Sequence, residues 1–126
     1  MTLEEFDREW DRCSAWLDAA LERGGRTHAL PDVRELVLGR PETFWFWPAS
    51  QSAAVTEIIR YPRLSVMRMW LAGGDLDQIK DAIPKVEAHG VLQGCTRFEI
   101  IGRIGWARAL RGHGYDHRAD VCWKEL

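Results

Sequence analysis

The chain has 126 residues, of which 46% are apolar and 29% charged, and its formal net charge is −2 at pH 7. This balance predicts a single domain over residues 1–126. Binding to nucleic acid needs concentrated Lys and Arg, and the sequence has no basic block, so we expect no nucleic-acid partner. No stretch approaches the roughly 18–20 apolar residues that cross a bilayer, so we expect no membrane span. The acidic N-terminal residues Glu4 and Glu5 argue against a signal peptide and predict a cytoplasmic protein.

An amphipathic helix is predicted at the start of the chain. Apolar residues recur at steps of three and four over residues 3–21, with charged residues between them. Thr2 and Glu5 have the spacing of a capping box at its N-terminus, and Gly24 ends it. A short second helix is expected over residues 32–38, between two prolines.

Three short strands are predicted next, over residues 43–47, 53–61 and 63–71, because these segments are rich in aromatic and β-branched residues. Their short connections indicate an antiparallel meander. The third strand is apolar on both faces, which is typical of a central strand. Residues 72–75 are predicted to turn the chain into a helix that Pro84 should kink or split.

The remaining pattern predicts a strand over residues 95–101, a short helix through Trp106, and a last strand over residues 118–125. In that last strand Ala119, Val121 and Trp123 share one face. The fold class that follows is α/β, with a mixed, mainly antiparallel sheet and helices on both faces.

Cys13, Cys95 and Cys122 have no paired spacing, so no disulfide framework is expected, and all three are predicted to be buried. His113 and His117 could suggest a metal site, but glycines interrupt the helix around them and no fourth ligand has suitable spacing. No metal is expected.

The most specific segment of the chain contains Gly102, Arg103, Gly105 and Trp106. This Gly-Arg-x-Gly-Trp segment resembles a group of small proteins with a GNAT-like fold that are common in tailed bacteriophages and prophages. GNAT denotes a superfamily of N-acetyltransferases. The order of the predicted elements is similar to the GNAT order over nearly the whole chain, although the N-terminal strand of the family is missing or very short.

The resemblance implies acetyl-CoA as cofactor and an amine as acceptor. The pyrophosphate would meet backbone N–H groups where the central strand enters the next helix. The residues of that segment are Leu71, Ala72, Gly73, Gly74, Asp75 and Leu76. The family pattern there is Gln/Arg-x-x-Gly-x-Gly/Ala, whose leading residue and glycine spacing are not matched. Asp75 is placed as an N-cap, and its carboxylate would occupy the N–H groups and repel phosphate. Two interpretations of this segment stay open: a turn followed by a capped helix, or a site that still binds CoA.

A general base in such a site would be a carboxylate, and Glu57 and Glu99 are the candidates. Glu57 stands on an otherwise apolar face, whereas Glu99 shares its face with Arg97, so a surface ion pair is the alternative. The tyrosine that protonates the leaving thiolate in many GNAT enzymes would fall at Leu110, which has no proton to donate.

Arg103 and Trp106 are the remaining candidates. Arg103 either satisfies strand-end carbonyls or a buried carboxylate, or binds a phosphate or an acidic group of a partner. Trp106 either packs under the sheet or forms a surface cleft with Trp70.

Two functions therefore stay open. The first is an acyl-CoA-dependent N-acetyltransferase of phage type, whose catalysis is in doubt. The second is a non-catalytic phage protein that acts through protein contacts in virion assembly or in the virion, in the host cytoplasm or the particle. The missing tyrosine, the altered loop and the seven tryptophans favour the second, because aromatic residues are enriched at protein interfaces.

Overall fold

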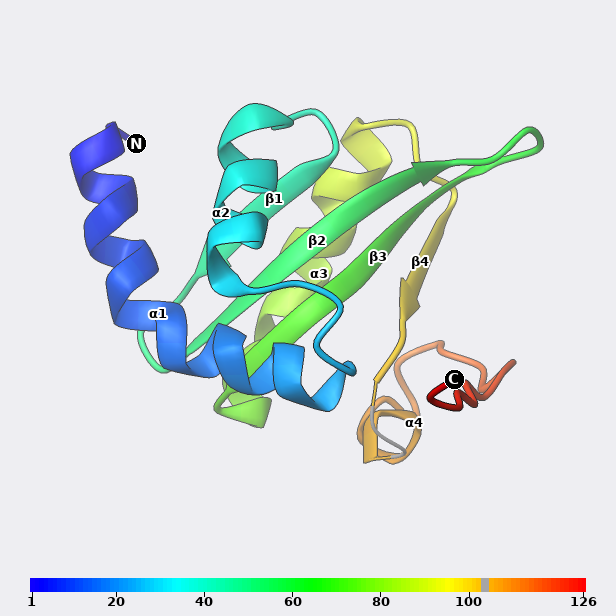
Figure 1. Cartoon of the computed structure of the whole chain (residues 1–126). Helices are drawn as coiled ribbons and strands as arrows, with labels where there is room; N and C mark the ends of the chain where they lie inside the picture. Colours follow the sequence, from blue (N-terminus) through cyan, green and yellow to red (C-terminus); the bar gives the residue numbers. More distant parts are fainter. Residues whose placement is uncertain (103–104) are drawn as a thin grey trace.

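The structure is a computed structural model that describes residues 1–102 and 105–126. Figure 1 shows its helices and strands. In chain order they are α1 (Leu3–Arg23), α2 (Leu30–Gly39), β1 (Phe44–Pro48), β2 (Ser52–Arg60), β3 (Ser65–Gly74), α3 (Leu76–Leu92), β4 (Arg97–Ile100) and α4 (Gly105–Ala109).

The first helix begins as the sequence predicts. The backbone N–H of Glu5 donates to Thr2 Oγ1 at 3.1 Å, and the N–H of Thr2 donates to Glu5 Oε2 at 3.1 Å, which completes the capping box. The buried stripe of α1 includes Trp10, Cys13 and Leu17. α2 begins slightly earlier than predicted, where the carboxylate of Asp32 accepts the backbone N–H of Ala29 at 2.9 Å.

The four strands form one sheet in the order β1-β2-β3-β4. The first three are antiparallel, as the meander predicts, and β4 pairs parallel to β3. Parallel pairing needs a crossover, which α3 supplies. The predicted α/β fold class with a mixed, mainly antiparallel sheet is confirmed.

Helices cover both faces of the sheet, with α1 and α2 in front and α3 behind (Figure 1). The cluster under α1 and α2 contains Phe6, Trp10, Cys13, Leu17, Ala20, Leu21, Val33, Val37, Phe44, Phe46, Ala53, Val55 and Leu71. Behind the sheet, Met67 packs with Val86, and Met69 packs with Ile79 and Ile83 of α3. The central strand β3 is therefore apolar on both sides because both sides are covered.

Two local predictions in this region are wrong. Gly73 and Gly74 do not form a turn, because β3 continues through both and pairs them with Ala53 and Ser52 of β2. Pro84 is predicted to kink or split the following helix, and the split does not occur, because α3 runs unbroken past it. Ile79, Ile83 and Val86 are buried against the sheet on both sides of the proline, and this packing stabilises the helix across Pro84.

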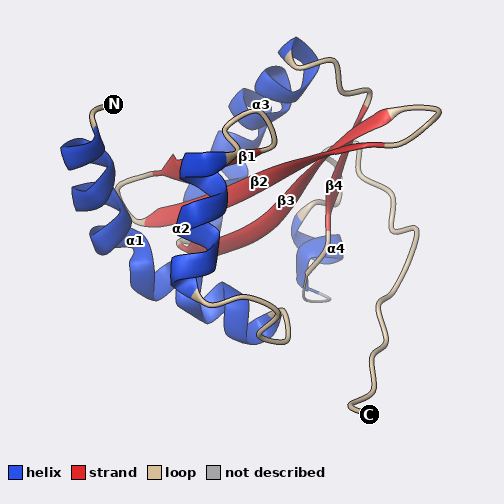
Figure 2. Cartoon of the chain, turned by 45° about the horizontal axis from the view of Figure 1, so that its top comes forward, coloured by secondary structure: helices blue, strands red, loops and turns tan. Residues whose placement is uncertain are grey.

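The predicted last strand does not form. Residues 115–126 have no regular secondary structure, and Val121 and Trp123 are 64% and 63% exposed. Figure 2 shows this segment as a loop that runs past β4 to the C-terminus. Cys122 is exposed there, against the expectation of burial, whereas Cys13 and Cys95 are buried as predicted. An alternating pattern favours a strand only when a neighbouring strand and a covering layer are available.

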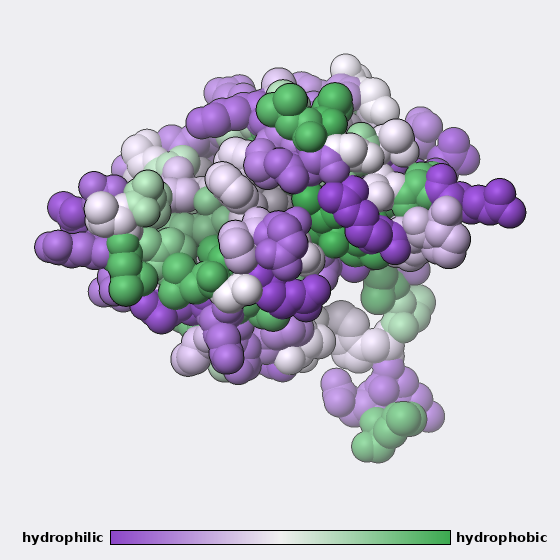
Figure 3. Space-filling model, turned by 90° about the horizontal axis from the view of Figure 1, so that it is seen from above, coloured by the Kyte–Doolittle hydropathy of each residue, from purple (hydrophilic) through white to green (hydrophobic). Residues whose placement is uncertain are grey.

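Figure 3 shows one face of the molecule, on which hydrophobic side chains lie in separate groups among hydrophilic ones. Within residues 1–102 and 105–126, no helix has the length and apolar character needed to pass through a bilayer.

Candidate functional site

The junction between β3 and α3 is the segment at which the sequence predicts a CoA site. Only Asp75 separates Gly74, the last residue of β3, from Leu76, the first residue of α3. Asp75 Oδ1 accepts the backbone N–H of Asp77 at 3.0 Å and faces that of Gln78 at 3.5 Å. Asp75 is thus an N-cap, as predicted, and its carboxylate uses donors that a phosphate would need.

The two glycines before Asp75 serve close packing. A Cβ at Gly73 would lie 2.9 Å from the carbonyl carbon of Trp16 in α1 and closer still to its oxygen. A Cβ at Gly74 would lie 2.6 Å from the Cα of Ser52, and Gly74 has a φ of +100° that favours glycine. Both positions therefore need glycine for reasons that involve no ligand.

Gln78 ties the start of α3 to the turn between β1 and β2. Its Oε1 accepts the N–H of Gln51 at 2.9 Å and the hydroxyl of Ser52 at 2.6 Å, and its Nε2 donates to Ser50 Oγ at 2.8 Å. The N–H of Asp75 also donates to the Gln51 carbonyl at 2.9 Å. These bonds fasten the N-terminus of α3 to the turn between β1 and β2, while Gly74, Asp75 and Leu76 stay exposed.

The other predicted residues of this segment have different environments. Leu71 is buried under α1, and the carbonyl of Ala72 accepts a hydrogen bond from Arg23 at 2.9 Å. Leu76 is 43% exposed. The segment passes from the core to the surface within a few residues, so its side chains do not line one binding site together.

The two predicted carboxylates do come together, and an arginine that the sequence analysis missed lies between them. The strand register places Arg68 of β3 opposite Glu57 of β2 and Glu99 of β4. Arg68 Nε lies 2.5 Å from Glu99 Oε1, and Arg68 Nη1 lies 3.7 Å from Glu57 Oε1. All three side chains are about one-third exposed, at 27%, 27% and 30%. No spacing along the sequence reveals this triad, because it exists only across three strands.

Of the two candidates that follow β4, Trp106 does not join the carboxylates. Trp106 lies over Gly102 and packs with Met69 and Ile79 behind the sheet. Trp70 packs instead near the front cluster, against His28 and Phe44. Trp106 and Trp70 therefore form no shared cleft. Arg103 lies outside the described residues, and its role stays a prediction.

Leu110, which stands at the position of the expected proton donor, is buried with Ile83 in the rear cluster. Tyr115 donates its hydroxyl proton to Glu87 Oε2 at 2.8 Å and packs edge-on to Phe98. Burial and then the bond to Glu87 raise the pKa of Tyr115 above its usual value. This tyrosine therefore stays protonated and connects α3 to the segment after α4 through its hydrogen bond.

Comparisons of the chain with family models, with curated proteins and with solved structures find no match. The GNAT-like relationship therefore stays a hypothesis that depends on the residues named above.

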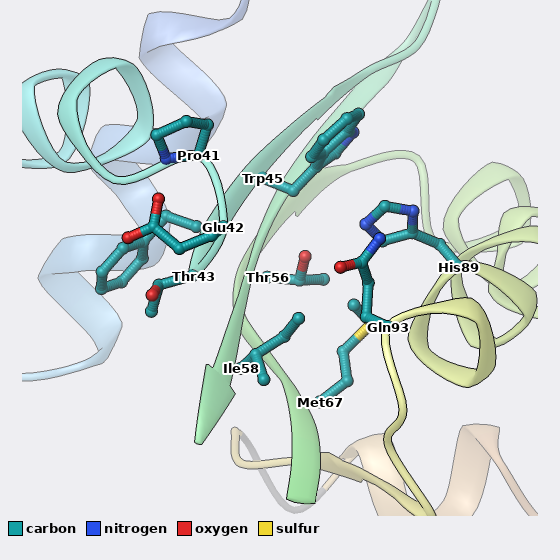
Figure 4. A pocket seen from close by; sticks show the side chains of 10 residues that line it. Pro41, Glu42, Thr43, Trp45, Thr56, Ile58, Met67, His89 and Gln93 are labelled. Carbon is teal, nitrogen blue, oxygen red and sulfur yellow. The ribbon is translucent and has the colours of Figure 1, made fainter. Parts of the chain in front are cut away.

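A second group of side chains lines a small cavity of about 30 Å³ between β1 and α3. Figure 4 shows Trp45, His89 and Gln93 on one side of it, with Ile58 and Met67 below them. The rings of Trp45 and Trp47 lie 4.6 Å and 5.3 Å from the ring of His89. Burial lowers the pKa of His89. A cavity of this size has room for a water molecule. It is too small to hold a substrate.

No group of three or more His, Cys, Asp or Glu side chains in residues 1–102 and 105–126 has a geometry that could hold a metal ion.

Proposed function

We propose that this chain carries a GNAT-like fold that has lost acetyl transfer and acts through protein–protein contacts, as a phage virion-associated or assembly protein. The β3–α3 junction carries the proposal. A single residue, Asp75, connects the two elements, so there is no loop to surround a pyrophosphate, and the carboxylate of Asp75 accepts the N–H groups of Asp77 and Gln78 in the first turn of the helix.

The surroundings of the carboxylates support the same proposal. Glu57 and Glu99 both face Arg68, so a general base would have to give up a charge-assisted contact before it could accept a proton. The position expected for a proton donor holds the buried Leu110. The resemblance of residues 102–106 to small phage proteins supplies the virion context.

The second candidate function is acyl-CoA-dependent N-acetyl transfer, and one observation favours it. Val55 pairs with Leu71 and Thr56 pairs with Met69, so Trp70 is an extra residue in β3 with no partner in β2. Such a β-bulge frees backbone polar groups, and a free N–H beside a parallel strand pair can polarise a thioester carbonyl. An acetyl-CoA and amine pair would then react near Glu57 or Glu99.

Calorimetric titration with acetyl-CoA and with CoA tests the proposal. We expect no binding with a Kd below about 1 mM, which corresponds to a binding free energy of about −4 kcal/mol. Micromolar binding would overturn the non-catalytic proposal. Asp75→Asn is the matched variant, because asparagine also caps helices but carries no charge. If the wild type binds CoA weakly at this junction, the variant should bind it more tightly.

The position of the gene tests the virion part of the proposal. Neighbouring genes for portal, tail or internal virion proteins would support it, and a setting without any phage gene would contradict it.

A further inference from the structure

β1 forms one edge of the sheet, and it pairs with β2 alone among the described strands (Figure 2). Natural edge strands carry charged side chains that prevent pairing with other strands. β1 has the sequence Phe-Trp-Phe-Trp-Pro and contains no charge. Trp45 is 43% exposed, and its indole N–H has no hydrogen-bond partner within the described part of the chain. This edge therefore lacks the charged side chains that would oppose pairing.

The hydrogen bonds at both ends of β1 show which backbone groups point outward. The N–H of Ile58 donates to the Thr43 carbonyl at 2.8 Å, and the N–H of Ala49 donates to the Ser52 carbonyl at 2.9 Å. Alternate residues of an antiparallel strand address the same side. The odd-numbered residues of β1 therefore face β2, and Phe44, Phe46 and Pro48 face the open edge.

Phe46 is the one residue of β1 that offers both a donor and an acceptor at this edge. Pro48 has no N–H, and the N–H of Phe44 already donates to the Arg40 carbonyl at 2.9 Å. A single residue with both groups free matches an identical residue in an antiparallel strand, because each N–H can donate to the carbonyl of the other.

We propose that β1 pairs with β1 of a second copy of this chain about a two-fold axis at Phe46, which joins the two sheets into one. The contact is self-complementary, as a two-fold interface must be. On the α3 side of the sheet, Trp45 of one copy lies beside Trp47 of the other, with Cβ atoms about 4.5–5.5 Å apart. The exposed indole of Trp45 is thereby covered. The pairing does not depend on whether the chain binds acetyl-CoA.

Pro48 and the engaged N–H of Phe44 limit this ladder to the two bonds at Phe46, so the dimer depends on protein concentration. Light scattering should show the mass rise from 14.5 kDa toward twice that value as the concentration increases from about 10 μM to about 1 mM. Hydrogen exchange of the Phe46 amide should slow over the same range. A constant monomer mass, or a Phe46 amide whose exchange ignores concentration, would overturn the proposal.

Trp45→Lys places a charge on the edge and should keep the chain monomeric. Val91→Lys is the control, because Val91 is 70% exposed on α3 and is not part of the edge strand, and the variant should dimerise like the wild type. Dimerisation of Trp45→Lys at wild-type strength would show that another surface is used. If Trp45→Lys does not fold, the exchange experiment on the wild type still decides the question.

Discussion

At the scale of single residues, the two glycines at the end of β3 link the sequence to the packing of the whole front layer. Gly73 lets the backbone of α1 approach β3 so closely that no side chain fits between them. The contact is made by the backbone of Trp16 in α1, three residues along β3 from the bulge at Trp70. A residue that looks like part of a phosphate loop in the sequence is thus a spacer between a helix and a strand.

We predict that Gly73→Ala lowers the free energy of unfolding by about 1–3 kcal/mol, because the added methyl group forces α1 away from the sheet. Gly39→Ala is the control, because a Cβ at Gly39 meets no atom within 4 Å. Its expected effect is within about 0.5 kcal/mol. Urea unfolding of both variants measures the difference, and equal stabilities would contradict the packing role of Gly73.

Arg68 is the residue that allows two carboxylates to face each other across β3. We predict that Arg68→Leu destabilises the fold by about 1–3 kcal/mol, toward the lower end because the three side chains are partly exposed to solvent. Glu57→Gln and Glu99→Gln together, added to Arg68→Leu, should recover much of the loss because they remove the repulsion. If the triple variant is as unstable as Arg68→Leu, the charges are not the cause.

His89 gives the fold a dependence on pH. Its pKa in the folded state is lower than the usual 6.5, because burial between the two indoles disfavours the charged ring. Between the folded and unfolded pKa values the unfolded chain binds more protons, so stability is lost as the pH falls below about 6.5. His89→Gln should remove this part of the slope of unfolding free energy against pH between 7 and 5. An unchanged slope would show that His89 titrates alike in both states.

Among the elements, α3 has the clearest boundary, and one side chain sets it. We predict that Asp75→Ala lowers stability by about 1 kcal/mol, because the N–H of Asp77 loses its acceptor. Asp75→Asn should stay close to the wild type, since an asparagine oxygen can accept the same bond. Thermal unfolding measures both variants. A similar loss in the two would mean that charge, and not capping, matters at this position.

The helices and the meander could be predicted because their signals are local. Thr2 and Glu5 define a cap, and the apolar steps of α1 define a buried stripe. The last strand could not be predicted in the same way, since its pattern of Ala119, Val121 and Trp123 says nothing about whether a neighbouring strand is within reach. The group of Arg68, Glu57 and Glu99 could not be predicted for a related reason, because it depends on the register of three strands.

Over the whole molecule, the two proposed functions would use different surfaces of the sheet. The front carries the bulge, Arg68 and its carboxylates, which is where acetyl transfer would have to occur. The far edge at β1 carries the uncharged aromatic strand and needs no cofactor. The β1 edge shares no residue with the β3–α3 junction, so a contact made through β1 would not depend on whether the junction binds acetyl-CoA.

The C-terminal segment divides at Tyr115 into a part that belongs to the folded core and a part that does not. Leu110 is buried and Tyr115 is bonded to Glu87, whereas residues 116–126 form no helix or strand. We predict that a chain ending at Tyr115 melts within about 4 °C of the full chain, which corresponds to less than about 1 kcal/mol.

A chain that ends at Ala109 should lose about 2–5 kcal/mol, because removal of Leu110 opens a cavity between α3 and the sheet. Circular dichroism melts of the three lengths test both statements, and brief proteolysis should stop near Tyr115. If the chain ending at Tyr115 melts as low as the one ending at Ala109, residues 116–126 take part in the fold. The contact between Trp123 and Gly25 at the end of α1 would then be the first place to look for their contribution.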